Sequence, residues 1–570
     1  MSDPPQVEAE QSKWQLKKKL SKAYDVVTLH LSKHSGVGFV CAVAYFDPGN
    51  WGVDLQAGSE YGYKLLFVVL LSGVFAVLLQ SLASKLGCVT GTDLASHCRL
   101  LFYNRPRHTL LYRWLVLYPL YVLAEIAIIS TDLSELLGSA MGLIMLFPKL
   151  PLWAGVLITA CDVFVILLVG DPLRRQPVKL FEWLIAAMVF SILVCMLVII
   201  TKIEVDWGQA FFGFVPSKKI FQAGGLYTSI GIIGATVMPH GLFIGSALAT
   251  QDRLSPAPLK DDNTSDAILR SLPEERKPIG ILNQIRSSLS EAFRNKAFND
   301  HKNRPQRYED RENNSYWFVK SHIYHGVVDI VLSLLGVAVT INSMILIVAS
   351  AVFYYGEGRS RSDSQNPASL FDAHDLLSKY VGKPAGVLFA VALLFSGQSS
   401  TIIATVAGQV VSEGFLNWSI SPFLRRVLTR LLSLIPAMAV ALALGRAGID
   451  QLLVASQVAL SIILPFIMLP LLWLTTNKEI MSVKRPESDL PALTADGSPS
   501  NPDISPASKF ATPKIGSSTE RDVEASPPPI TEMVDYSNGK IIAGIGYLTW
   551  IVVIVANAYV IVMLAMGKSG

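Results

Sequence analysis

The sequence predicts an all-α, polytopic membrane protein made of two inverted five-helix repeats and an eleventh transmembrane helix. Of its 570 residues, 51% are hydrophobic and 16% are charged, whereas about a quarter of the residues in a soluble domain are charged. A mean hydropathy of +0.43 over this length exceeds what one globular core can bury, because single cores stop growing at about 250 to 300 residues. Two proline-interrupted apolar segments at corresponding positions predict the repeat.

Eleven apolar stretches are long enough to cross about 30 Å of hydrocarbon as helices. They are too long and too uniformly apolar for the strands of a membrane barrel, which alternate polar and apolar residues, so helices remain as the spanning structure. The stretches are 35–58, 63–86, 112–140, 150–169, 178–201, 222–250, 321–354, 382–414, 424–445, 449–475 and 541–566.

The distribution of charge orients these helices. Residues 1–34 are polar and lysine-rich, and such segments remain in the cytosol. An odd number of spans then places the carboxyl terminus outside the cell or in a lumen. The predicted parts are a basic cytosolic segment (1–34), transmembrane helices 1–6 (35–250), a polar cytosolic insert (251–320), helices 7–10 (321–475), a disordered cytosolic loop (476–540), and helix 11 with a short carboxyl terminus (541–570).

Two of the apolar stretches contain a proline-centred interruption. The first span reads AYFDPGNWG at 44–52, and the sixth reads GATVMPHGLFIG at 234–245. Broken helices at matching positions of two repeats are typical of transporters whose substrate binds near the middle of the bilayer. The sequence therefore predicts a transport site between these two breaks.

The residue types at the breaks favour a cation as the bound species. Proline disrupts the hydrogen bond to the carbonyl four residues earlier, which releases the oxygens of Ala44 and Ala235. Asp47 and Asn50 add a carboxylate and an amide oxygen, and Met238 adds a thioether. Oxygen ligands alone would suit Ca²⁺ or Mg²⁺, whereas one sulfur favours a transition metal. A methionine in a membrane helix can also simply fill a packing gap, and that alternative stays open.

A third group of residues is predicted to move protons. Metal binding requires an ionised Asp47, so a cation and a proton compete for it, and co-transport needs further acceptors. Glu125, Asp132 and Glu135 in the third span are spaced to share one helical face, as a proton relay would. The alternative is that local hydrogen bonds neutralise these acids for packing.

The ordered set of motifs resembles the Nramp family (natural resistance-associated macrophage proteins), which are proton-coupled divalent-metal transporters. DPGN at 47–50 and MPH at 238–240 carry the resemblance. Further matching stretches are TDLSELLG at 131–138, GQSSTIIATVAGQ at 397–409, FLRRVLTR at 423–430 and SQVALSIILPF at 456–466. The resemblance spans all eleven helices and leaves out the cytosolic inserts.

The resemblance implies a LeuT-like fold and a symporter that carries Mn²⁺ or Fe²⁺, with cobalt or cadmium as further cargo, into the cytosol with protons. The metal would be the substrate, and no cofactor is implied. Asp47, Asn50 and Met238 would bind it with the carbonyls of Ala44 and Ala235, and Gln457 would add a ligand in some conformations.

The resemblance also assigns residues to proton coupling. His240 would set the pH dependence rather than bind metal, and the arginine pair Arg425 and Arg426 would hold Asp132 or Glu135 in its ionised form. Many family members have a second histidine five residues after the first, where this chain has Gly245. Any pH response that depends on that second histidine is therefore doubtful here.

Two other functions fit parts of the sequence. A sodium-coupled amino acid or amine symporter could share the fold, and a metal-sensing membrane receptor could use the long inserts for signalling. An enzyme is not expected, because the sequence has no nucleophile-base pair, phosphate loop or HExxH helix. Nearly balanced charge, 48 basic and 44 acidic residues, argues against nucleic-acid binding. Plasma, endosomal and vacuolar membranes all satisfy the predicted topology.

Overall fold

The computed structural model describes most of the chain as a bundle of helices. The described residues are 37–161, 179–254, 307–356, 369–417, 422–485 and 532–566. The basic segment 1–34 and most of the two polar inserts lie outside these ranges.

Helices lie in each of the eleven predicted stretches, although the fourth is described only in part. The first half contains α2 (Val37–Val43), α3 (Pro48–Tyr61), α4 (Leu66–Thr90), α5 (Leu94–Phe102), α6 (Thr109–Tyr112), α7 (Tyr118–Leu146), α8 (Leu152–Ala160), α10 (Lys179–Ile200) and α11 (Trp207–Phe212). The second half contains α12 (Ala223–Thr236), α13 (Pro239–Leu248), α16 (Tyr316–Ser333), α17 (Val339–Ala349), α19 (Leu370–Leu376), α20 (Lys383–Leu416), α21 (Pro422–Ala443), α22 (Gly445–Thr476), α23 (Lys478–Met481) and α24 (Lys540–Ala565).

Short 3₁₀ and π segments connect or interrupt these helices: η2 (Gly62–Leu65), η3 (Arg113–Leu117), η4 (Lys218–Phe221), η6 (Tyr308–Asp310), η7 (Leu334–Ala338), η8 (Ser350–Tyr354) and η9 (Leu377–Val381). Among the described residues, eight helices are long and apolar enough to cross a membrane, and one of them, Pro48–Thr90, joins α3 to α4. The shorter apolar helix Val427–Ala443 lies within the predicted ninth span.

Both predicted interruptions separate two helices at a proline. α2 ends at Val43, and Pro48 begins α3 with Asp47 as its N-cap. α12 ends at Thr236, and Pro239 begins α13 after Met238. Proline is favoured at the first turn of a helix because its missing N–H would have no partner there. The same residue that ends one helix therefore begins the next.

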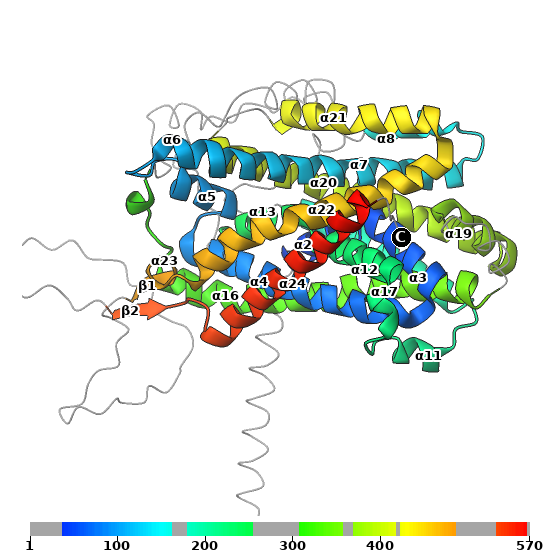
Figure 1. Ribbon diagram of the computed structural model, residues 1–570, viewed down its shortest axis with the longest axis horizontal. Coiled ribbons are helices and arrows are strands. Elements are labelled where there is room, and N and C mark those ends of the chain that lie inside the picture. Colours follow the sequence, from blue (N-terminus) through cyan, green and yellow to red (C-terminus); the bar gives the residue numbers. More distant parts are fainter. Residues whose placement is uncertain are drawn as a thin grey trace, which may run out of the picture.

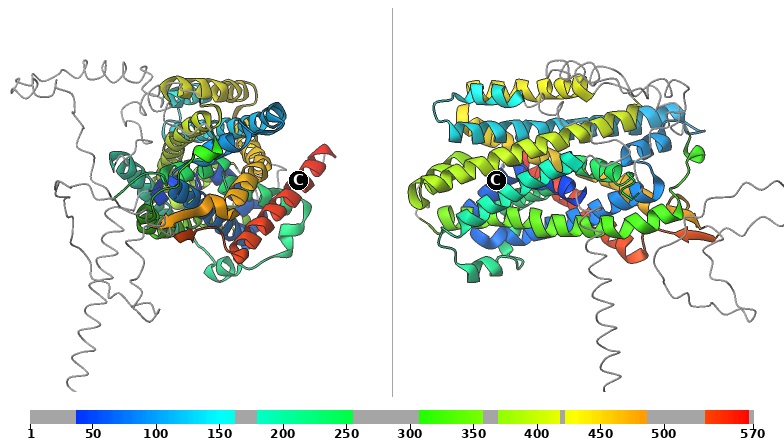
Figure 2. Two further views of the ribbon diagram at one scale, coloured as in Figure 1. Left: turned by 90° about the vertical axis from the view of Figure 1, so that its left-hand side faces the viewer. Right: turned by 180° about the vertical axis from the view of Figure 1, so that it is seen from behind.

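The broken helices lie in the centre of the bundle, and the last helix lies at its edge. In the most apolar stretch of α12 and α13, 94% of the residues are buried inside the bundle, compared with 28% in the most apolar stretch of α24. Figure 1 shows α24 crossing the outside of the bundle over α22, and the end view in Figure 2 shows it projecting from one side. Burial on all sides allows irregular backbone at membrane depth, because neighbouring helices can satisfy the freed polar groups.

The two ends of the bundle carry different connections. α5, α23 and the strands lie at one end in Figure 1, and α11 and α19 lie at the other. Asn313, just before α16, donates hydrogen bonds to the carbonyls of Ile480 (2.9 Å) and Ser482 (2.7 Å). The two polar inserts therefore meet at the same end of the bundle.

Two predicted details at this end need correction. Residues 476–540 are not disordered throughout, because β1 (Ser482–Arg485) pairs in antiparallel register with β2 (Glu532–Asp535). This strand pair is a small departure from a purely helical fold within the described residues. α16 begins at Tyr316, ahead of the predicted start at 321, because Ser315 caps it by accepting a hydrogen bond from the amide of Phe318.

Candidate metal centre

The two breaks lie against each other in the interior. The side-chain amide nitrogen of Asn50 is 2.9 Å from the carbonyl oxygen of Ala235. A β-carbon added to Gly241 would lie 3.4 Å from the Tyr45 hydroxyl and 3.8 Å from the Ala44 side chain. Segments almost 200 residues apart in sequence thus form one site, as the repeat pattern predicts.

Asp47 is the acidic residue of this site and is fully buried. Its Oδ1 accepts hydrogen bonds from the backbone amide (2.9 Å) and the side-chain amide (2.8 Å) of Asn50. Its Oδ2 accepts one from the hydroxyl of Ser134 on α7, at 3.1 Å. Gly138 on the same helix leaves room for Pro48, since an added β-carbon would lie 2.0 Å from the proline ring. α7 therefore fixes both the position of the break and the orientation of its carboxylate.

Asn50 bridges the two halves of the site through its side-chain nitrogen. That nitrogen donates both to Asp47 and to the Ala235 carbonyl. Its Oδ1 faces away from them, 3.4 Å from the side-chain nitrogen of Asn342 and 3.5 Å from the hydroxyl of Thr236. A bound cation would need the amide oxygen turned toward it, so binding requires this side chain to rotate.

The carbonyl groups of the first break are not equivalent. The Tyr45 oxygen accepts a hydrogen bond from Asn342 (2.8 Å), and the Phe46 oxygen accepts one from Ser396 (2.7 Å). No described donor reaches the Ala44 oxygen. Buried carbonyls almost always have a partner. Ala44 is thus the member of the break whose oxygen is available to a cation.

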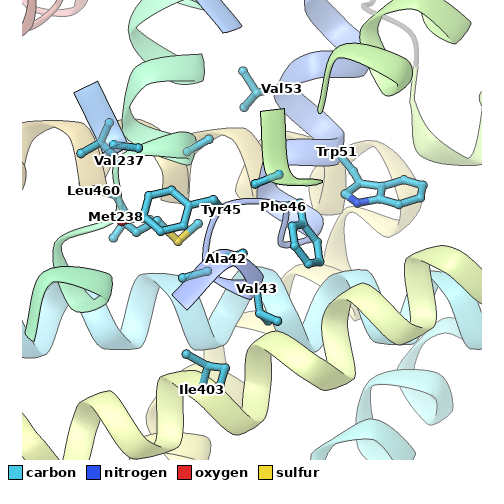
Figure 3. Packing of buried hydrophobic residues seen from close by; sticks show 14 of the residues in the cluster. Ala42, Val43, Tyr45, Phe46, Trp51, Val53, Val237, Met238, Ile403 and Leu460 are labelled. Carbon is cyan, nitrogen blue, oxygen red and sulfur yellow. The ribbon is translucent and has the colours of Figure 1, made fainter. Parts of the chain in front are cut away.

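Met238 is fully buried between the two half-helices and precedes Pro239 in extended backbone. It belongs to the same buried cluster as Tyr45 and Phe46, and Figure 3 shows its sulfur drawn among these residues of the first break. Its position satisfies both interpretations of the sequence, as a soft ligand and as a packing residue. The selectivity experiment in the Discussion separates them.

Gln457 of α22 reaches the first break. A β-carbon on Gly49 would lie 1.8 Å from the Nε2 atom of Gln457, so a larger residue at this position of the DPGN motif would displace the Gln457 side chain. The Oε1 atom of Gln457 is buried and has no hydrogen-bond partner among the described residues. An unpaired oxygen at Gly49 of the first break is consistent with an additional cation ligand.

His240 lies on the α7 side of the site. Its Nδ1 is 3.3 Å from the Thr131 hydroxyl, and its Nε2 is buried without a described hydrogen-bond partner. Gly245, which replaces the second histidine, packs against Gln80: an added β-carbon would lie 1.6 Å from the Gln80 Nε2. Gln80 also accepts a hydrogen bond from the Tyr45 hydroxyl at 2.9 Å. A titratable side chain at position 245 would therefore have to displace Gln80 from this arrangement.

The three acids of α7 do not share one environment. Glu125 forms an ion pair with Arg425 (2.8 Å) and is partly exposed. Asp132 is fully buried and lies 3.1 Å from Arg430. Glu135 instead accepts a hydrogen bond from Ser400 of α20, at 2.6 Å. Glu125 and Asp132 therefore face α21, while Glu135 is rotated toward α20.

The partner of Arg425 differs from the predicted one. Arg425 pairs with Glu125 rather than with Asp132 or Glu135, and Arg430, one turn beyond the predicted pair, takes Asp132. The reason is the register between α7 and α21, which run in the same direction. Position 425 therefore lies next to position 125, and position 430 lies next to position 132. The side chain of Arg426 lies outside the described residues.

Several polar residues at the site were not singled out from the sequence. Ser134, Asn342, Ser396 and Ser400 hydrogen-bond to the breaks or to the acids, but a serine or asparagine in a membrane helix carries no signal of its own. Asp54 is different, because an acid in the middle of a span is a functional candidate by default.

Comparison with known proteins identifies the family. Residues 38–488 match the family described as Natural resistance-associated macrophage protein-like (Nramp). The Manganese transporter pdt1 of Schizosaccharomyces pombe is 38% identical over 539 residues, which cover 94% of this chain and 86% of the relative. The Iron transporter SMF3 of Saccharomyces cerevisiae is 34% identical over 558 residues, which cover 96% of this chain and 99% of the relative.

Solved structures agree with the sequence comparison. A crystal structure of a mutant manganese transporter from Eremococcus coleocola superposes with a TM-score of 0.60 at 27% identity, covering 92% of this chain and 85% of that one. The fold defines an all-helical, multi-pass membrane transporter of the LeuT-like class, as predicted. The chain belongs to the Nramp family of divalent metal transporters, and it is a transporter rather than an enzyme.

Proposed function

We propose that the protein is a proton-coupled symporter that moves Mn²⁺ or Fe²⁺ into the cytosol. The observation that carries the proposal is the meeting of two helix breaks, where the Asn50 side chain binds both Asp47 and the Ala235 carbonyl in the interior and the Ala44 carbonyl has no described donor. One carboxylate and several oxygens, with Met238 nearby, match the mixed ligand preference of these two metals. The relatives named for manganese and iron transport support this substrate class.

The orientation is part of the proposal. We place the amino terminus and both polar inserts in the cytosol, because basic residues flank the spans on that side. The contact between the end of the first insert and β1 supports one common side for the two inserts. Import then proceeds from the α11 and α19 end toward the strand pair.

Uptake into proteoliposomes tests the function directly. The full-length protein is reconstituted, and radiolabelled Mn²⁺ uptake is measured with an inward acid gradient and without one. We expect the gradient to accelerate uptake, and Mn²⁺ entry to acidify the vesicle interior. No uptake above protein-free vesicles would refute the proposal, and uptake of amino acids driven by sodium would support the alternative symporter.

His240 should act on protons more than on metal. We expect His240→Ala to shift the pH profile of uptake while the Kd for Mn²⁺ changes less than about threefold, because the imidazole contacts Thr131 rather than the Asp47 oxygens. Uptake is measured between pH 5 and 8, the range of histidine titration, and Kd by calorimetry. A large loss of affinity with an unchanged pH profile would assign His240 to the metal instead.

The second insert should be dispensable for transport. We expect replacement of residues 486–531 by a short glycine-serine linker to leave Mn²⁺ uptake unchanged, because the linker closes a hairpin in which β1 and β2 stay paired next to α22 and α24. A receptor that signals through this segment would lose its output instead. Removal of 480–535 is the matched comparison, because it also deletes the Ile480 and Ser482 carbonyls that bind Asn313, and it should lower the thermal stability.

A further inference from the structure

Asp54 is a buried acid that the proposed transport mechanism does not use. It lies in α3, is 1% exposed, and its Oδ2 has no hydrogen-bond partner among the described residues. An ionised carboxylate without a partner is strongly disfavoured in a low-dielectric interior. Asp54 must therefore either stay neutral or receive a cation during the working cycle.

The position of Asp54 favours the cation. Asp47, Asn50 and Asp54 are spaced by three and four residues, which places them on one face of α3. The helix rises about 1.5 Å per residue, so Asp54 lies about 6 Å beyond Asn50 along its axis. α3 runs from the break toward the α11 and α19 end of the bundle. Asp54 is thus on the side from which an imported ion arrives.

The helix that faces Asp54 offers further oxygens. α17 packs along this face of α3: Asn342 lies 3.4 Å from Asn50, and a β-carbon on Gly58 would lie 2.5 Å from the Leu346 carbonyl. Asp54 lies between these two contacts in sequence and on the same face. The Asn342 Oδ1 is buried and has no described hydrogen-bond partner, and the same holds for the hydroxyl of Ser343 beside it.

These oxygens share a chemistry. A carboxylate, an amide oxygen and a hydroxyl are hard ligands, which bind Mn²⁺, Mg²⁺ or Ca²⁺ and need no sulfur. Asn342 also links this point to the centre, because its side-chain nitrogen contacts both Asn50 and the Tyr45 carbonyl. An ion held here would lie next to the side chain that must rotate to open the central site.

We propose that Asp54 and the Asn342 amide oxygen form an outer cation station, which binds the divalent ion before it reaches Asp47. This inference rests on the proposed transport function. The station accelerates capture of the ion and leaves the affinity of the central site to Asp47 and its neighbours. It lacks a soft ligand, so it concentrates divalent cations without selecting among them.

Transport kinetics test the station. Mn²⁺ uptake is measured in proteoliposomes for the unmodified protein, Asp54→Asn, Asp54→Glu and Glu60→Gln. We expect Asp54→Asn to raise KM about tenfold, which corresponds to about 1.4 kcal/mol, with kcat and the calorimetric Kd of the central site within about twofold. Asp54→Glu retains a carboxylate and should raise KM less. Glu60→Gln is the matched control, because Glu60 is a half-buried acid on the same helix with its own partner, Gln56.

The isosteric asparagine distinguishes the station from a packing role. If Asp54 only fills space as a neutral acid, Asp54→Asn leaves KM unchanged, and that result overturns the inference. If the unmodified protein does not transport Mn²⁺, the proposed function fails instead. Should Asp54→Asn not elute as a monodisperse species, Asp54→Ser is measured in its place, with the same tenfold rise in KM expected and an unchanged KM again overturning the station.

Discussion

Asp47→Ala is expected to abolish transport and the high-affinity binding of Mn²⁺. Asp47 is the buried carboxylate at the meeting point of the two breaks, and its two oxygens organise Asn50 and Ser134 around that point. Removing the negative charge leaves neutral oxygens to hold a divalent ion. A loss of only about 3 kcal/mol would weaken binding more than about 100-fold.

The measurement combines Mn²⁺ uptake in proteoliposomes with calorimetry on purified protein. Asp206→Asn is the control, since Asp206 caps the exposed helix α11 and asparagine caps a helix equally well. The control should transport at the unmodified rate. Appreciable flux through the Asp47→Ala protein would place the transport site elsewhere.

Met238→Ala is expected to preserve Mn²⁺ uptake but to let Ca²⁺ or Mg²⁺ compete. Loss of the thioether would leave an all-oxygen site, and such a site no longer discriminates against hard cations. Competition is measured as the inhibition of radiolabelled Mn²⁺ uptake by increasing Ca²⁺ or Mg²⁺. The shift should be on the order of tenfold or more in the inhibitory concentration, as for one lost ligand of about 1.4 kcal/mol.

A second buried methionine controls for lost packing. Met468 of α22 is also fully buried and lies three turns beyond Gln457 along the helix. Met468→Ala should cost stability like any large-to-small core change, without altering the selectivity. Equal Ca²⁺ competition in the two variants would show that Met238 is only a packing residue.

The positions of the breaks could be predicted from the sequence because proline acts locally. Pro48 and Pro239 cannot donate a backbone hydrogen bond and are favoured in the first turn of a helix, and each begins a helix here. Pro465 and Pro470 lie inside α22 without ending it, so the residues around a proline also matter. Asp47 and the carbonyls of Ala44 and Ala235 follow from the same local chemistry. In the structure the Asn50 side chain joins Asp47 to the Ala235 carbonyl, and the role of these groups as metal ligands remains a prediction.

The partners of the acids could not be predicted, because they depend on how two helices slide past each other. A shift between α7 and α21 would break the ion pairs of Glu125 and Asp132, and nothing within either helix sets that register. Similarly, Gly245 shows only that a histidine is missing from the sequence. The packing of Gln80 against Gly245 depends on the tertiary structure and cannot be read from the sequence.

Asp54 and the strand pair show two further limits. Asp54 follows Asp47 by seven residues in the same span, and the rule that marks intramembrane acids could have found it without a structure. β1 and β2 are four residues each and close a long polar segment, so their sequences give no periodic signal above the surrounding composition. Short pairings of this kind depend on the helices that bring the two ends together.

The bridging amide of Asn50 has a consequence for how tightly cargo can be held. An arriving ion does not enter a site of bare oxygens; it replaces N–H groups that already bind Asp47 and Ala235 at 2.8 and 2.9 Å. The net affinity is thus the difference between two satisfied arrangements and stays moderate even with a charged ligand. A transporter has to release its ion within each turnover. Because the empty site is already hydrogen-bonded internally, that release requires less free energy.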